Sequence, residues 1–228
     1  MSADNHLAFL KQLRDQGYDF DVIYDVGSNI GEWSVDVQEI YPNSRFELFE
    51  PLAGQFKDID DNLMISRLRN AKLHAVALSD KSGTGDIKIL DVNGQGSSII
   101  VHPADKRRED FDVISCQLDR MDDYVERNSL QQPDFIKLDT QASELKVLKG
   151  GEQTIKNAKF ILVETWIRRV YGPGSPIFQE IANWLYQRDF ILYDMIITDD
   201  GRDADGTLRW FDAVYINKSA SKFPPELL

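Results

Sequence analysis

The segment Asp25-Val26-Gly27-Ser28-Asn29-Ile30-Gly31 has the residue types and spacing best suited to binding a ligand. It follows an apolar run that predicts a strand and precedes apolar residues at helical spacing. Glycines let a ligand approach the backbone, and a helix N-terminus offers free N–H groups to an anionic end. The segment does not spell G-x-G-x-x-G, and Asp25 at the strand tip would repel a pyrophosphate. A zwitterionic amino-acid group fits better, so we predict that this loop, with Asp25 beside the free N–H groups, binds S-adenosylmethionine. The alternative is a tight strand-to-helix turn whose glycines serve only steric needs.

Glu50 ends the second predicted strand, about 20 residues after Gly31. In this class of fold an acid at that position accepts hydrogen bonds from both ribose hydroxyls of the cofactor, and NAD-binding proteins share the feature. The alternative is that Glu50 only caps the helix expected near Pro51. Spacing and strand-end position favour ribose binding.

The end of the third predicted strand is expected to border the adenine. Leu78 or its neighbours would pack against the ring, and Ser79 and Asp80 would face its polar edge. The same residues also fit a simple turn.

Asp139 and Glu164 end the fourth and fifth predicted strands, on the edge where open α/β sheets bind ligands. Methyl transfer from a sulfonium to an alcohol needs an aligned acceptor oxygen and removal of its proton. Three interpretations stay open: either carboxylate is a base with a raised pKa, both bind Mg²⁺, or Asp139 contacts only the cofactor. We favour the first and third together, without a metal, because two carboxylates are few ligands for Mg²⁺. Glu144 is expected to be a helix N-terminal acid or a salt-bridge partner.

His102 is the histidine expected to have a role in catalysis. It follows residues 96–101 in a segment that should overhang the cleft, and an ordinary imidazole pKa near 6.5 suits proton transfer. An exposed loop histidine is the alternative. His6, on the N-terminal helix, and His74, within a strand, are expected to be structural.

The residues after Glu164 mix aromatic side chains, arginines and glycines, which favours a lid over the acceptor. Trp166 and Tyr171 could stack on a sugar or ring, and Arg168 could bind a carboxylate or phosphate of the substrate. The alternative is a loop whose aromatic residues pack on the helix that begins near Pro176.

Apolar runs and helical stripes alternate along the chain and predict an α/β fold in one domain, 1–228. A short helix is expected over 4–16, and a β-rich insertion over about 82–118. The last two apolar runs flank a turn rich in Asp and Gly and predict an antiparallel hairpin. Together these features predict a Rossmann-like class I methyltransferase sandwich with a seven-stranded, mostly parallel sheet. The strands are expected at 22–26, 46–49, 73–78, 135–138, 160–163, 190–197 and 211–216.

The 228-residue chain has a formal net charge of −12, which disfavours nucleic acid as a partner. Cys116 is the only cysteine, so neither an intramolecular disulfide nor a cysteine-based metal cage can form. The sequence shows no signal peptide and no apolar stretch long enough to span a membrane. We therefore expect a cytoplasmic protein that acts on a small molecule.

From Val22 to about Asn217 the sequence resembles the FkbM-type methyltransferases. The matching segments are DVGSNIGEWS, FELFEP, AVALSD, GSSI, LDRMDDY, FIKLDTQASELKVLKGG, FILVETW and WFDAVYIN. The resemblance implies S-adenosylmethionine-dependent methylation, usually of a hydroxyl on a sugar, polyketide or other natural product. It also implies cofactor contacts by Gly27, Ser28, Asn29, Gly31, Glu50, Ser79 and Asp139.

Two positions depart from the family pattern. Family members usually have Ala where Ser28 stands and Gly where Ala142 stands. A hydroxyl beside the cofactor carboxylate should be tolerated at Ser28. Ala142 bears on the local backbone geometry if that turn requires a positive φ.

Two rival functions remain open. An NAD-dependent oxidoreductase or epimerase would share the glycine loop and the later acid, but the spelling of the loop and the terminal hairpin argue against it. Tyr124 and Tyr171 also lack the lysine three residues later that short-chain dehydrogenases use. The second rival is a cofactor-binding scaffold that has lost catalysis.

Overall fold

The computed structural model describes residues 3–89, 97–98, 113–224 and 226, and its main sheet has the strand order β3-β2-β1-β7-β8-β10-β9. β10 runs antiparallel to both of its neighbours, and the other pairs are parallel. This is the class I methyltransferase fold that the sequence predicts. The strands are β1 (Val22–Val26), β2 (Arg45–Phe49), β3 (Ala71–His74), β7 (Phe135–Leu138), β8 (Phe160–Trp166), β9 (Phe190–Ile196) and β10 (Trp210–Asn217).

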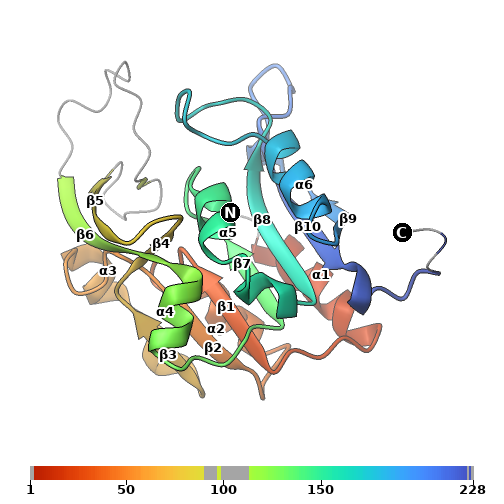
Figure 1. Ribbon diagram of the computed structural model, residues 1–228, viewed down its shortest axis with the longest axis horizontal. Helices are drawn as coiled ribbons and strands as arrows, with labels where there is room; N and C mark the ends of the chain where they lie inside the picture. The colour runs from red at the N-terminus through yellow and green to blue at the C-terminus, as the bar shows by residue number, and fades with distance from the viewer. Residues whose placement is uncertain (1–2, 90–96, 99–112, 225, 227–228) are drawn as a thin grey trace.

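Helices cover both faces of this sheet (Figure 1). Side chains alternate along each strand, so each face carries its own apolar cluster. On one face lie α4 (Met121–Arg127), α5 (Glu144–Gly150) and α6 (Phe178–Tyr186); on the other lie α1 (Ala3–Asp15) and α2 (Glu32–Gln38). The remaining helical segments are α3 (Lys57–Asn62) and the short 3₁₀ turns η1 (Ile65–Arg67), η3 (Thr154–Asn157), η4 (Asp199–Gly201) and η5 (Lys218–Ala220).

A second, smaller sheet confirms the β-rich insertion. It has the order β4-β6-β5, from β4 (Ala77–Ser79), β5 (Gly83–Lys88) and β6 (Val113–Arg120). The single third strand predicted at 73–78 is wrong, because the chain turns tightly where the Val76 N–H donates to the His74 carbonyl at 2.9 Å. The strand therefore splits between the two sheets. Within the predicted insertion, residues 90–96 and 99–112 lie outside the described residues.

The register of the strands aligns charged side chains on the face covered by α1 and α2. Asp25 on β1 lies opposite Lys137 on β7. Leu138 pairs with Val163, which places Asp139, just past β7, beside Glu164 on β8. Glu164 in turn lies opposite Asp212 on β10. β8 continues to Trp166, so Glu164 lies within the strand rather than at its end, in a row of three carboxylates on neighbouring strands.

No helix in the described ranges combines the length and the apolarity that crossing a bilayer requires.

Gly27 marks the closest approach between the β1 loop and the end of β7. Its φ is +79°, and a Cβ there would lie 1.9 Å from the Asp139 carbonyl oxygen. Gly54 has a similar φ of +76° with nothing within 4 Å of the same position. Gly54 therefore serves as a control that isolates the backbone strain from the steric clash.

We expect Gly27→Ala to destabilise the protein by about 2 kcal/mol or more beyond Gly54→Ala. Both substitutions incur the left-handed strain of about 1–2 kcal/mol, but only the first must also displace the β7 backbone. Urea unfolding of the two variants measures the difference. Equal losses of unfolding free energy would show that the contact between Gly27 and Asp139 does not constrain the loop.

Candidate active site

A cavity of about 260 Å³ opens at the carboxyl ends of β1, β2, β7 and β8 and at the amino end of the antiparallel strand β10. Residues of the β1 loop line one part of it, and the apolar residues Phe49, Leu52, Val76 and Leu78 line another. The carboxylates of Asp139, Glu164 and Asp212 line a third part. The cavity therefore has an apolar wall beside the glycine loop and an acidic end beyond it.

The β1 loop places Gly27, Ser28 and Asn29 on the cavity wall. Asn29 has a φ of +49°, and Gly31 adopts a φ of +85° at the N-cap of α2. Gly31 is not itself on the wall, so its role is to let the chain turn into the helix. The structure thus brings together three of the loop residues expected at the ligand.

Glu50 lies on the cavity wall with its carboxylate fixed by the backbone. Oε2 accepts from the Asn29 N–H and Oε1 from the Leu52 N–H, both at 2.9 Å. Burial raises the pKa of this carboxyl to about 7, and the two backbone hydrogen bonds oppose that rise. Each oxygen has accepting capacity left for a ribose hydroxyl.

Several wall residues carry buried polar atoms without a partner in the described part of the chain. They are Ser28 Oγ, Trp33 Nε1, Ser97 Oγ and Ser143 Oγ. Buried polar atoms are normally hydrogen-bonded, and an unsatisfied one costs free energy. These atoms, the β1 loop around Gly27, Glu50 and the apolar wall together fit a ligand with an amino-acid group, a ribose and an apolar ring.

The sequence predicts that Asp25 faces the ligand, but in the structure this residue is not on the cavity wall. Its carboxylate is fully buried, accepts from Ser34 Oγ at 2.7 Å and pairs with Lys137 Nζ at 3.1 Å. The prediction that Asp25 binds the cofactor directly is therefore wrong. Its charge instead stabilises the buried ammonium of Lys137.

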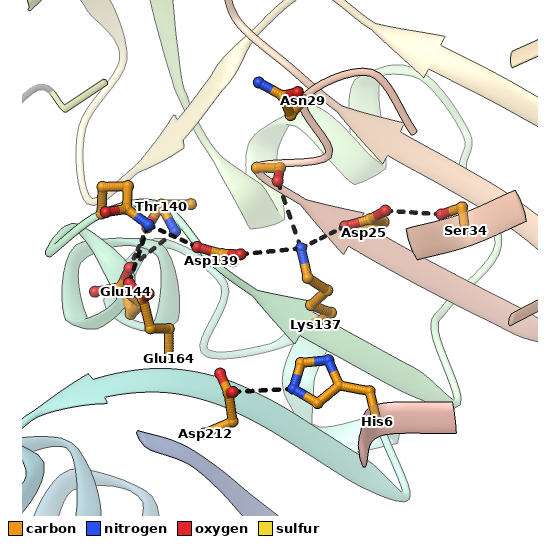
Figure 2. Close-up of polar contacts among 12 residues, drawn as sticks. His6, Asp25, Asn29, Ser34, Lys137, Asp139, Thr140, Glu144, Glu164 and Asp212 are labelled. Carbon is orange, nitrogen blue, oxygen red and sulfur yellow. Dashed lines mark hydrogen bonds and ion pairs between the residues drawn. The ribbon is translucent and has the colours of Figure 1, made fainter. Parts of the chain in front are cut away.

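Lys137 joins the glycine loop to the acidic end of the cavity, as Figure 2 shows. Its Nζ lies 3.1 Å from Asp25 Oδ1, 3.5 Å from Asp139 Oδ2 and 3.5 Å from the Gly27 carbonyl oxygen. Burial acts to lower the pKa of Lys137, but the two carboxylates raise it above its ordinary value, so the side chain stays charged. Sequence reasoning passed over this lysine, although a lone lysine in an apolar strand was a usable signal.

Gln141 connects the two carboxylates proposed for chemistry. Its Nε2 donates to Asp139 Oδ1 at 2.9 Å and to Glu164 Oε2 at 3.1 Å, and its Oε1 accepts from Tyr171. Gln141 and Ala142 have φ values of +51° and +77°, so this turn does adopt the positive φ that the family's usual glycine would favour. Burial raises the pKa of Glu164 well above its ordinary value, and the charges of Asp139, Glu144 and Asp212 raise it further.

Glu144 begins α5 and faces the turn rather than the cavity. Its Oε1 accepts from the Thr140 N–H at 2.8 Å and from the Ala142 N–H at 3.2 Å. The helix N-terminal interpretation of this residue is therefore confirmed. Burial raises its pKa to about 7.

Ser79 and Asp80 are not on the cavity wall, contrary to their expected place at the adenine edge. Ser79 is buried, and its carbonyl packs against Gly150, where a Cβ would lie only 1.8 Å from the oxygen. This contact with α5 turns the end of β4 away from the ligand. Ala77 and Leu78 do line the cavity, in agreement with the expected packing on the ring.

The residues expected to form an acceptor lid are also off the wall. Trp166 and Tyr171 are buried in a cluster with Ala142 and Trp210, and Arg168 pairs with Asp203. These aromatic residues are packed, as the alternative expected, but their partners are Ala142 and Trp210 rather than residues of α6. Tyr171 supports the site indirectly through Gln141.

The three histidines have different outcomes. His102 lies outside the described residues. His74 is buried between Glu47 and Tyr124, as a structural histidine should be. His6, also expected to be structural, lies on the cavity wall, and its Nε2 is 2.9 Å from Asp212 Oδ2.

In the ranges that the structure describes, no group of three His, Cys, Asp or Glu side chains is arranged to hold a metal ion. The carboxylates of the row have protein partners: Gln141 donates hydrogen bonds to two of them, and Lys137 and His6 each pair with one.

Comparison with known proteins agrees with this geometry. Residues 25–192 match the methyltransferase FkbM domain, from the glycine loop into β9. The chain belongs to the FkbM methyltransferase family. It is therefore an S-adenosylmethionine-dependent methyltransferase, and the cavity residues described above fit that cofactor.

Relatives of this FkbM methyltransferase include the 2-O-methyltransferase NoeI of Sinorhizobium fredii, 28% identical over 166 residues and 68% of each chain. The hexuronic acid methyltransferase AglP of Haloferax volcanii is 24% identical over 68% of this chain and 60% of its own. The crystal structure of magnesium protoporphyrin IX methyltransferase from Synechocystis with bound S-adenosylmethionine superposes with a TM-score of 0.52. The two chains are 10% identical, and the match covers 95% of this chain and 78% of the other. This similarity therefore shows a shared fold only.

Removal of the Glu50 carboxylate should weaken cofactor binding. We expect Glu50→Ala to raise the Kd for S-adenosylmethionine at least about tenfold, because hydrogen bonds to a charged acceptor contribute about 1.5–3 kcal/mol each. Isothermal titration calorimetry measures this, with the exposed Glu126→Ala as the control. Unchanged affinity in Glu50→Ala would remove Glu50 from the ribose site.

The buried carboxyls make the stability of the ligand-free FkbM methyltransferase depend on pH. Glu50, Glu144 and Glu164 have raised pKa values, so the folded state holds protons that the unfolded state releases. The contribution of Glu50 and Glu144 is fully present below the unfolded pKa of about 4.5 and is lost as pH rises through about 7. The contribution of Glu164 is lost as pH rises through its own raised pKa. The free energy of unfolding should fall between pH 5 and 7.5.

Chemical denaturation across that range checks this prediction in wild type and in two variants. Glu164→Gln should flatten the curve, because its amide does not titrate, whereas the exposed Glu126→Gln should leave the slope unchanged. A free energy of unfolding that rises with pH over this window would contradict the raised pKa values of these buried carboxyls.

Proposed function

We propose that this methyltransferase transfers a methyl group to a hydroxyl of a small molecule without negative charge, most simply a sugar or another hydroxylated natural product. The observation that carries the proposal is the carboxylate row at the acidic end of the cavity. Asp139, Glu164 and Asp212 offer oxygen acceptors to hydroxyl groups, and a row of hydrogen-bond acceptors suits a polyol.

The charge on the described wall supports an acceptor that is neutral or cationic. Its carboxylates are those of Glu32, Glu50, Asp139, Glu164 and Asp212, whereas the ammonium of Lys137 is already paired with two carboxylates. Arg168, the residue expected to bind an anionic substrate, pairs with Asp203 away from the cavity. A uronate or phosphate would be repelled by wall carboxylates such as those of Asp139 and Asp212.

The names of the relatives support the reaction class. NoeI is a 2-O-methyltransferase and AglP a hexuronic acid methyltransferase, so oxygen and sugar acceptors both occur among proteins similar to this chain. The charges on the cavity wall favour a neutral sugar over a uronic acid as the acceptor.

The proposed division of the cavity gives each end its own task. Gly27, Ser28, Asn29 and Glu50 hold S-adenosylmethionine, which supplies an electrophilic methyl group when bound. Glu164 orients the acceptor hydroxyl, and Gln141 fixes the spacing between Glu164 and Asp139. The negative charge of Asp139 and its neighbours favours a cationic sulfonium at this end of the cavity.

A panel of acceptors tests the proposal. Purified protein is incubated with labelled S-adenosylmethionine and neutral glycosides, amino sugars, uronates or polyketide alcohols, and products are identified by mass spectrometry. We expect O-methylated neutral or amino sugars to form at least about tenfold faster than methylated uronates. Methylation confined to uronates, or binding of NAD in place of S-adenosylmethionine in calorimetry, would overturn the proposal.

A further inference from the structure

His6 reaches the cavity because the apolar stripe of α1 points it there. Leu10 and Leu13 are fully buried in the cluster between α1 and the main sheet. Side chains three or four residues apart share one helix face, so the packing of Leu10 fixes His6 one turn earlier on the same side. The helix thus brings an imidazole to the end of the carboxylate row.

The ring is oriented by a partner from the other end of the chain. Nε2 of His6 lies 2.9 Å from Asp212 Oδ2, and the side chains are only 13% and 10% exposed. Figure 2 shows His6 projecting from α1 toward Asp212 on β10. A carboxylate acceptor at Nε2 places the hydrogen of a neutral imidazole there, which leaves the lone pair on Nδ1.

The other candidate bases are already engaged. Gln141 Nε2 donates to both Asp139 and Glu164, and Lys137 pairs with Asp139. Nδ1 of His6, by contrast, makes no hydrogen bond to the residues that the structure describes. Both His6 and Asp212 line the same cavity as Glu164, which lies opposite Asp212 in the sheet.

We propose that His6 is the general base of the methyl transfer and that Asp212 is its positioning residue, an inference that rests on the proposed O-methylation. The acceptor hydroxyl gives its proton to Nδ1 as its oxygen bonds to the methyl carbon. The electron pair of the broken carbon–sulfur bond stays on sulfur. Asp212 stabilises the imidazolium that forms, so the pair acts as a unit built from the first helix and the last strand.

Kinetics of His6→Gln test the catalytic role. We expect the single-turnover rate with the best acceptor of the panel to fall about 100-fold or more, the usual contribution of a general base. The Kd for S-adenosylhomocysteine should stay within about twofold of wild type, because Glu50 and the glycine loop are unchanged. Lys11→Gln, on the exposed side of α1, is the matched control and should alter neither value.

Nitrogen NMR of the imidazole gives a readout that does not depend on turnover. The neutral His6 ring should be the Nε2–H tautomer in wild type, and Asp212→Asn should shift the population toward Nδ1–H. An Nδ1–H tautomer in wild type, or a wild-type rate in His6→Gln, overturns this proposal while leaving O-methylation in place. Wild-type protein that methylates no hydroxyl acceptor overturns the proposed function and this inference with it.

Discussion

The buried ammonium of Lys137 holds the two halves of the site together. It contacts Asp25 on β1, the Gly27 carbonyl of the cofactor loop, and Asp139 at the acidic end. Removal of one member of a buried ion pair leaves an uncompensated charge and typically costs 3–5 kcal/mol. The glycine loop can therefore approach β7 closely only while this lysine neutralises Asp25, and the place of Asp139 depends on the same contact.

The fold was largely predictable, because local patterns and connection rules determine it. Alternating apolar runs and helical stripes predicted the parallel strands, and the turn rich in Asp and Gly predicted the hairpin of β9 and β10. The split between β3 and β4 escaped prediction, since one apolar stretch serves two sheets and only the turn at Val76 divides it. The extension of β8 past Glu164 was missed for a similar reason: its antiparallel pairing with β10 is a long-range contact.

The site was predictable where strand ends define it and unpredictable where distant segments meet. Glu50 and Asp139 lie on the wall because they follow parallel strands that end at one edge, and Glu164 lies close to the same edge within β8. Asp25 was misjudged, since its partner Lys137 lies on another strand. The pair of His6 and Asp212 joins residues 206 positions apart, which no local spacing reveals. A lone aspartate inside the apolar run of β10 was the one available signal.

A crystal structure with S-adenosylhomocysteine and a neutral glycoside bound together would test most directly how the cavity is divided between cofactor and acceptor. We expect the ribose hydroxyls on Glu50, the amino-acid end at the loop of Gly27 to Asn29, and the acceptor hydroxyl between Glu164 and His6. A ribose away from Glu50, or a glycoside bound outside the carboxylate row, would contradict this division.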